Sequence, residues 1–147
     1  MTYEGQNPMV VDTNVVSYIY RNENRAQPYL NHLTGHRAVI SFQTYEELLF
    51  GALISNWGQQ SVDELLEYVS TAYDIINYDL ELVRISARLR ADSRRSGREL
   101  KSPDGWIAAT AILLNCTLLA HDGDFDCIPG LKLIRYRDDG RVAVRRP

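Results

Sequence analysis

Short apolar runs alternate along this chain with longer segments in which apolar residues recur every three or four positions. The runs are rich in β-branched and aliphatic residues, which are typical of buried strands. They predict five strands, over residues 9–12, 38–42, 73–76, 117–120 and 132–134. The longer segments between them have the periodicity of helices with one buried face. Strands that alternate with helices favour an α/β fold with a mainly parallel sheet and helices on both faces.

Two helices are predicted between the second and third strands. The first covers residues 45–54, and the second contains the apolar positions Leu65, Leu66 and Val69 and is expected to be capped by Ser61. This pair is an insertion in an otherwise regular series of strands and helices. Because no repeat, low-complexity segment or linker divides the chain, we expect a single domain over residues 1–147.

A long helix over residues 79–96 and a shorter one that starts near residue 102 precede the fourth strand. Gly97 is expected to end the long helix. In the shorter helix Ser102 is expected to act as the cap and Pro103 to occupy the first helical position. The shorter helix is almost wholly apolar from residue 106 to residue 114, so we expect it to be buried against the sheet.

The composition places the chain among ordinary globular domains. A chain of 147 residues buries about two thirds of its unfolded surface and needs no disulfide to fold. Its two cysteines, Cys116 and Cys127, lack the spacing of a zinc site and are expected to be reduced. Residues 1–8 are polar and contain no apolar signal segment, and no run is long enough to cross a membrane. We therefore expect a soluble protein in the cytoplasm.

The net charge of −3 conceals an uneven distribution of charge. Residues 84–101 carry a net charge of +5 and residues 132–147 a net charge of +4, whereas the rest of the chain stands at −12. Arginines spaced along one helix are typical of proteins that bind a phosphate backbone, although a solvated helix face has the same pattern. The charges alone leave both interpretations open.

Several carboxylates are expected at one edge of the sheet, because the ends of parallel strands and the starts of the helices that follow them share that edge. Asp12 ends the first strand, and Asp104 begins the helix before the fourth strand. The other candidates are Glu46 and Glu47, after the second strand, and Asp122 and Asp124, after the fourth. Three or four carboxylates in one place repel one another unless a cation neutralises them. A hard divalent cation, Mg²⁺ or Mn²⁺, fits such a set of oxygen ligands.

Each acid also has a structural interpretation that involves no metal. Asp12 could cap the helix that follows it, and Asp104 would stabilise any helix from its first turn. Asp122 and Asp124 could belong to a simple turn around Gly123, and the two glutamates could lie on the surface. The order of the acids along the alternating chain favours a shared site.

Four stretches of the sequence together resemble the PIN-domain ribonucleases, and within them the toxins of VapBC-type toxin–antitoxin pairs. The stretches are residues 10–15, 40–51, 103–111 and 118–125. The resemblance implies a PIN-like three-layer sandwich in which a parallel sheet of about five strands lies between helices. It also implies an acidic pocket that binds Mg²⁺ or Mn²⁺ and cleaves RNA.

The resemblance assigns catalytic roles to Asp12, Glu47, Asp104 and Asp122. Asp12, Asp104 and Asp122 are then the expected metal ligands, with Asp124 as an alternative to Asp122. Helical phase places Glu46 nearer the apolar flank of its helix, so it is the motif that selects Glu47. The family commonly has Thr or Ser at the position of Ala120, so one hydroxyl that could support the site is absent here.

Substrate and partners follow from the same resemblance. A carboxylate pocket at a sheet edge reaches single-stranded or looped RNA more easily than a duplex. Asn14 is expected to hold Asp12 or to contact the phosphate, and Arg94, Arg95 and Arg98 are expected to contact the RNA backbone. Toxins of this family are typically homodimers held inactive by a small antitoxin, a segment of which enters the active-site groove.

Two alternatives remain at this point. A haloacid dehalogenase-like phosphatase also has an aspartate after its first strand, but it needs a second aspartate where this chain has Asn14, and neither Lys101 nor Lys132 is a convincing catalytic lysine. The other alternative is a PIN-like module that binds RNA or protein without catalysis. His32, His36 and His121 form no ligand set; we interpret the first two as surface residues and expect His121 near the pocket.

Overall fold

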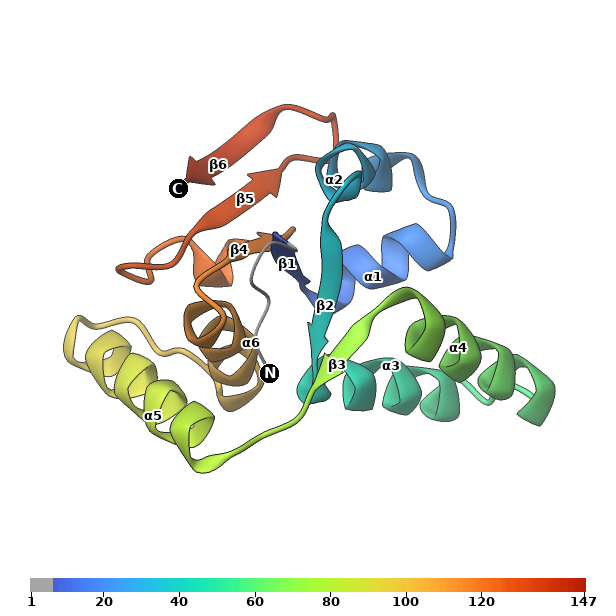
Figure 1. Cartoon of the computed structure of the whole chain (residues 1–147), viewed down its shortest axis with the longest axis horizontal. Coiled ribbons are helices and arrows are strands. Elements are labelled where there is room, and N and C mark those ends of the chain that lie inside the picture. Colours follow the sequence, from blue (N-terminus) through green and yellow to red (C-terminus); the bar gives the residue numbers. More distant parts are fainter. Residues whose placement is uncertain (1–6) are drawn as a thin grey trace.

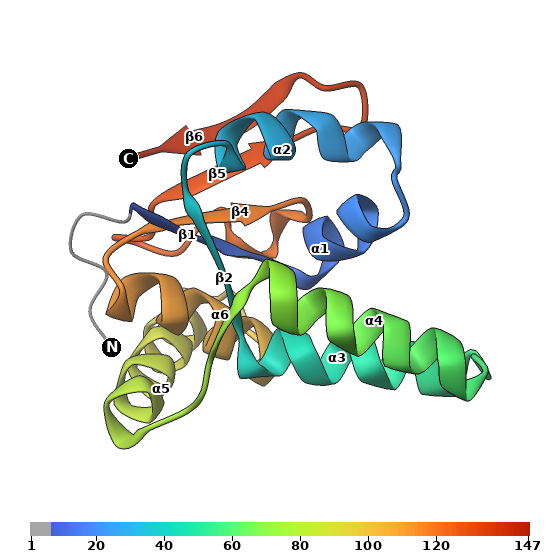
Figure 2. The same cartoon turned by 45° about the vertical axis from the view of Figure 1, so that its right-hand side comes forward.

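The computed structural model describes residues 7–147, which form a six-stranded sheet between two layers of helices (Figures 1 and 2). The expectation about the N-terminal segment therefore falls almost entirely on residues 1–6, outside the described residues. The strands are β1 (Pro8–Val11), β2 (Arg37–Ser41), β3 (Asp74–Ile76), β4 (Thr117–Ala120), β5 (Leu133–Tyr136) and β6 (Val142–Arg146).

Helices connect these strands. They are α1 (Thr13–Tyr20), α2 (Gln27–Leu33), α3 (Phe42–Ile54), α4 (Gln59–Ala72), α5 (Leu80–Arg95) and α6 (Ser102–Leu113), with short 3₁₀ turns η1 (Asn24–Ala26) and η2 (Gly123–Phe125). Within residues 7–147, none of the helices combines the length and the apolarity that crossing a membrane would require.

The order of the strands across the sheet is β3-β2-β1-β4-β5-β6. The first five strands are parallel, and β6 runs antiparallel to β5. From β1 the chain builds the sheet outward through β2 to β3, and then returns to add β4 on the other side of β1. The gap beyond the carboxyl ends of β1 and β4 is therefore the point at which the direction of winding reverses, where open α/β sheets bind their ligands.

Alternation along the strands divides the core into two halves. Val10 faces the layer of α5 and α6, while Met9 and Val11 face the layer of α1 to α4. Leu118 and Leu119 divide in the same way on β4, so both central strands are buried on both faces. This explains why these strands are continuous apolar runs in the sequence.

The structure differs from the predicted elements in three details. The sheet has a sixth strand, and α2 is a further helix that the sequence analysis did not predict. The helix after β2 begins at Phe42, because Ser41 caps it by accepting a hydrogen bond from the Gln43 backbone N–H over 3.1 Å.

Two predicted helix caps also differ from the structure. Ser61 lies inside α4, whose cap is Gly58, and Ser102 is the first residue of α6, with Lys101 at the cap position. Gly97 follows the end of α5 with φ of +82°, as predicted for a residue that stops a helix.

Helices α5 and α6 pack very closely where Gly105 faces Ser86. A Cβ atom at Gly105 would lie 2.9 Å from Ser86 Oγ and 3.0 Å from Arg90 Cδ. Gly105 is buried and directly follows Asp104. The absence of a side chain at residue 105 therefore sets how closely α5 can approach the acidic start of α6.

We predict that Gly105→Ala destabilises the protein by about 1–3 kcal/mol, although alanine is the better helix former, because the added methyl group must displace α5. Urea unfolding would measure the loss. The double variant Gly105→Ala/Ser86→Ala, which removes the closest atom, is expected to recover part of it. A single variant as stable as the wild type would contradict this account of the packing.

Candidate active site

Asp12 follows β1 directly and is buried, with only 3% of its surface exposed. Its backbone N–H donates to the Leu119 carbonyl over 2.9 Å, which fixes the residue beside the end of β4. It occupies the cap position of α1, but its side chain makes no capping hydrogen bond. Burial raises the pKa of Asp12 well above its usual value, and Asp122 raises it further, against a lowering by the Thr13 amide. The capping interpretation therefore does not explain this carboxylate.

Glu47, rather than Glu46, faces this site. The Thr13 hydroxyl donates to Glu47 Oε1 over 3.1 Å and also lies 3.0 Å from the Thr44 hydroxyl. Glu46 is exposed, whereas Glu47 is half-buried. Burial raises the pKa of Glu47, and hydrogen bonds from Thr13 and Gln43 oppose that rise. The choice between the two glutamates depends on how α3 is seated against α1, which helical periodicity does not reveal.

Asp104 reaches the same edge from the first turn of α6. Burial and, in decreasing order, the negative charges of Asp122, Asp124 and Glu47 together raise its pKa to about 7. Asp104 is also among the acids that raise the pKa of Asp12. The helix that precedes β4 thus brings its acid to the site, which the sequence alone did not guarantee.

Asp122 follows β4 and is held by hydrogen bonds from two other residues of the site. Its carboxylate accepts hydrogen bonds from the Asp124 backbone N–H over 3.0 Å and from Asn14 Nδ2 over 3.3 Å. It caps the η2 turn, and burial raises its pKa. Asn14 therefore holds Asp122 in the structure, not Asp12. Of the two candidates for the fourth acid, Asp122 is the one whose negative charge is among the causes that raise the pKa of Asp12.

The four carboxylates fit a hard divalent cation by their chemistry, because all the donors are oxygens and each of the four pKa values is raised by burial. The charged groups that act most strongly on Asp12 are the acids Asp122, Asp104 and Glu47, and each of them raises its pKa. Within residues 7–147, no group of three or more His, Cys, Asp or Glu side chains is already close enough to hold an ion. The acids share one region without forming a finished cage.

Tyr29 supports the site from α2, and the sequence analysis missed it. Its buried hydroxyl donates to the Ala120 carbonyl over 2.7 Å, accepts from the Tyr136 backbone N–H over 3.0 Å, and lies 2.8 Å from His121 Nδ1. His121 Nε2 in turn lies 2.7 Å from Asp138 Oδ1. These contacts fix the end of β4 immediately before Asp122. No pattern in the segment around Tyr29 indicated this role.

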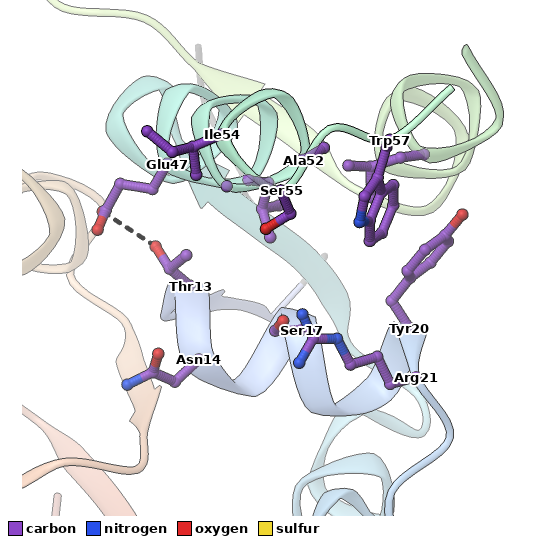
Figure 3. Close-up of a pocket in the computed structure, with 13 residues that line it drawn as sticks. Thr13, Asn14, Ser17, Tyr20, Arg21, Glu47, Ala52, Ile54, Ser55 and Trp57 are labelled. Carbon is purple, nitrogen blue, oxygen red and sulfur yellow. Dashed lines mark hydrogen bonds between the residues drawn. The ribbon is translucent and has the colours of Figure 1, made fainter. Parts of the chain in front are cut away.

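A groove leads away from the acids between α1 and α3 (Figure 3). Thr13, Asn14 and Glu47 lie at one end, and Tyr20, Arg21 and Trp57 at the other. The cavity measures about 200 Å³. It is therefore continuous with the carboxylate site and ends beside an exposed arginine.

The three arginines predicted to contact RNA have different surroundings. Arg95 pairs with Asp92 at 3.3 Å, Arg98 contacts the Cys127 sulfur, and Arg94 is exposed. His32 bonds the Tyr136 hydroxyl at 2.5 Å, whereas His36 is exposed. His121 is turned toward Tyr29 and Asp138, and it does not line the groove.

Comparison with known proteins agrees with this arrangement. The PIN domain matches residues 9–131, which include all four acids. The chain belongs to the PIN-domain family. It is 31% identical over 121 residues to the toxin FitB of Neisseria gonorrhoeae, covering 78% of this chain and 87% of FitB. It is 28% identical over 115 residues to the ribonuclease VapC1 of Haemophilus influenzae, covering 77% of this chain and 85% of VapC1.

Solved structures have the same fold. The VapBC2 complex of Rickettsia felis, crystallised with a DNA fragment from its promoter, contains a chain that superposes with a TM-score of 0.75 at 23% sequence identity. The match covers 88% of this chain and 98% of that chain. The predicted PIN-like sandwich is thereby confirmed, with six strands in place of about five. Membership of the PIN-domain family also removes the haloacid dehalogenase alternative.

We predict that Asp104→Asn stabilises the metal-free PIN domain. The raised pKa means that the ionised carboxylate costs stability, a cost that is absent below the unfolded-state pKa of about 3.9 and complete above about pH 7. Thermal unfolding in EDTA should therefore show a melting temperature a few degrees above wild type at about pH 8, and a smaller gain at about pH 5. Asp92→Asn, on the exposed surface of α5, is the matched control. An equal gain at both pH values would contradict the electrostatic account.

Proposed function

We propose that this PIN-domain protein is a divalent-metal-dependent endoribonuclease and the toxin of a type II toxin–antitoxin pair. The observation that carries the proposal is the burial of Asp12 among Glu47, Asp104 and Asp122, with no basic residue among the charges that act most strongly on it. Such an arrangement costs stability unless it serves a cation. Similarity to the ribonuclease VapC1 and the toxin FitB supports RNA as the substrate.

The four acids have different proposed roles in catalysis. Asp12 and Asp104 are the proposed direct metal ligands, and Asp122 completes the metal site, with Asn14 holding its carboxylate in place. Glu47, hydrogen-bonded to Thr13, is the proposed general base that accepts a proton from the attacking water. A bound Mg²⁺ or Mn²⁺ would acidify that water and neutralise charge on the scissile phosphate. A cation would also have to draw the carboxylates closer than they now lie.

The proposed substrate is single-stranded or looped RNA in the cytoplasm. A carboxylate pocket at the edge of a sheet reaches an accessible single strand more easily than the interior of a duplex. Arg94, Arg95 and Arg98 are the proposed contacts to the RNA backbone, since an acidic pocket needs a cationic rim to attract a polyanion. A PIN-like module that only binds RNA or protein is the competing function.

Cleavage of a mixed RNA pool tests the proposal. We expect Mg²⁺ or Mn²⁺ to support cutting and EDTA to stop it, and Asp12→Asn or Asp104→Asn to reduce the rate by more than about a hundredfold, because each removes a metal ligand. Gel analysis of the end-labelled RNA fragments would measure the rates.

Glu46→Gln is the control for charge, because it neutralises the exposed neighbour of Glu47. It should cut like the wild type, whereas Glu47→Gln should not. A wild type that leaves RNA intact with either metal, or variants of Asp12 and Asp104 that cut normally, would favour the binding module.

We further propose that the protein forms a homodimer and binds an antitoxin. Relatives of this chain were crystallised as VapBC and FitAB complexes. The groove between α1 and α3 suits an antitoxin segment, because it is partly apolar and opens onto the acidic site. A cationic side chain of the antitoxin could then neutralise the carboxylates in place of the metal.

Protein isolated from its host is expected to co-purify with a small partner. Light scattering should give the separated chain a mass of about twice 16.8 kDa, and removal of the partner should increase RNA cleavage. A host preparation that is fully active and contains this chain alone would contradict the antitoxin, and a separated chain with the mass of a monomer would contradict the dimer.

A further inference from the structure

Three aromatic rings meet beside the acidic site. Phe42 opens α3, Tyr78 lies in the loop between β3 and α5, and Trp106 stands two residues after Asp104 in α6. The centroid of the Phe42 ring is 5.2 Å from that of Trp106 and 5.7 Å from that of Tyr78, both in edge-to-face geometry. We call these three residues the aromatic platform. It lies at the edge of the sheet where the strands end, as the acids do.

Core packing does not account for Tyr78. Phe42 and Trp106 are half-buried, but 63% of Tyr78 is exposed. The loop that presents it is held on both sides: Asn77 Oδ1 accepts from the Tyr78 backbone N–H over 2.9 Å, and Asp79 Oδ1 caps α5 by accepting from the Leu82 N–H over 2.8 Å. The backbone that carries this exposed ring is therefore held by local hydrogen bonds, which lowers the entropy cost of ordering the loop when a base stacks on the ring.

The surface continues from Tyr78 onto α5. One face of this helix combines apolar and basic side chains at spacings of three and four residues, all exposed except the half-buried Ala91: Leu80, Val83, Arg84, Ala87, Arg88, Ala91, Arg94 and Arg95. Between the arginines lies a shallow hollow, floored by Ala87 and Ala91. Within residues 7–147, the side chains of Arg84, Arg88 and Arg94 make no hydrogen bond or ion pair, so their guanidinium groups have no anionic partner in this part of the chain. The helix spans about 24 Å, the length of several nucleotides.

The basic face of α5 is connected to the catalytic edge. Helix α5 crosses the start of α6 where Gly105 meets Ser86 and Arg90, directly beside Asp104. Figure 1 shows α5 lying against α6, away from β6. Arg84 and Arg88 lie on the side of α5 that faces away from Ser86 and α6, so they are reached from the acids by way of the aromatic platform and the start of α5.

We propose that the aromatic platform and the basic face of α5 bind the single-stranded RNA that flanks the scissile phosphate, with a base stacked on Tyr78 and the backbone along Arg84 and Arg88. This proposal rests on the ribonuclease function proposed above. Base stacking on aromatic rings and phosphate contacts to arginines are the two interactions by which proteins hold single strands without reading their sequence.

Binding can be measured apart from cleavage. Fluorescence anisotropy with a labelled, unstructured RNA of about 12 nucleotides in EDTA reports the flanking surface while the metal is absent. We expect Arg84→Ala/Arg88→Ala to bind about tenfold more weakly and to reduce the slope of log K against log salt by about 1.4, since each contact to a single strand contributes about 0.7. Tyr78→Ala should also bind about tenfold more weakly, but with an unchanged salt slope.

Two further variants serve as controls. Arg141→Ala/Arg145→Ala removes the same charge from exposed positions at and just before β6 and should change the affinity by less than about threefold. Arg84→Lys/Arg88→Lys keeps the charge and should keep the salt slope. All variants lie on the surface, and circular dichroism would verify that each is folded.

The outcomes separate the two proposals. If the α5 and Tyr78 variants bind RNA like the Arg141/Arg145 control, the proposal that this surface binds the flanking RNA is wrong, even if the wild type cleaves RNA. If the wild type binds but never cuts with metal, the ribonuclease is wrong and the binding surface stands. If light scattering shows that Tyr78→Ala converts a dimer into a monomer, the face is an interface between copies, and the RNA proposal is overturned.

Discussion

Repulsion among one buried and three half-buried carboxylates is the constraint on which the site depends. The fold brings four acids from four different segments to the reversal point between β1 and β4, and burial opposes the ionisation of each. The favourable interactions of the rest of the fold must therefore offset the mutual repulsion of these carboxylates. Hydrogen bonds from neutral groups position these acids. The Thr13 hydroxyl donates to Glu47, the Asn14 amide donates to Asp122, and the Tyr29 hydroxyl fixes the end of β4 just before Asp122.

Burial of the central strands explains which parts of the fold could be predicted from the sequence. The five parallel strands are recognisable because β1 and β4 are buried on both faces, and the order of the acids follows from the rule that strand ends share an edge. The sixth strand was missed because β6 contains two arginines and lies on the edge of the sheet, where an apolar pattern is not required. Helix α2 was missed because it is short and exposes much of its surface.

The fine selection among residues needed the folded chain. Glu47 faces the site and Glu46 faces solvent because of the way α3 packs against α1, where Thr13 donates a hydrogen bond to Glu47. Tyr29 and the aromatic platform are contacts between segments far apart in sequence, so no local pattern marks them. The family motif supplied Glu47 correctly, because it records an outcome of tertiary packing that local periodicity does not contain.

The two edges of the sheet have a consequence for assembly. A strand with free backbone groups invites another strand to pair with it, and proteins discourage this with very short or charged edges. Here β3 is three residues long, and β6 ends in Arg145 and Arg146. Neither edge offers a long apolar ribbon on which a second sheet could grow. Pairing of copies through their sheet edges is therefore disfavoured, and the sheet serves as an internal scaffold whose helices form most of the surface open to partners.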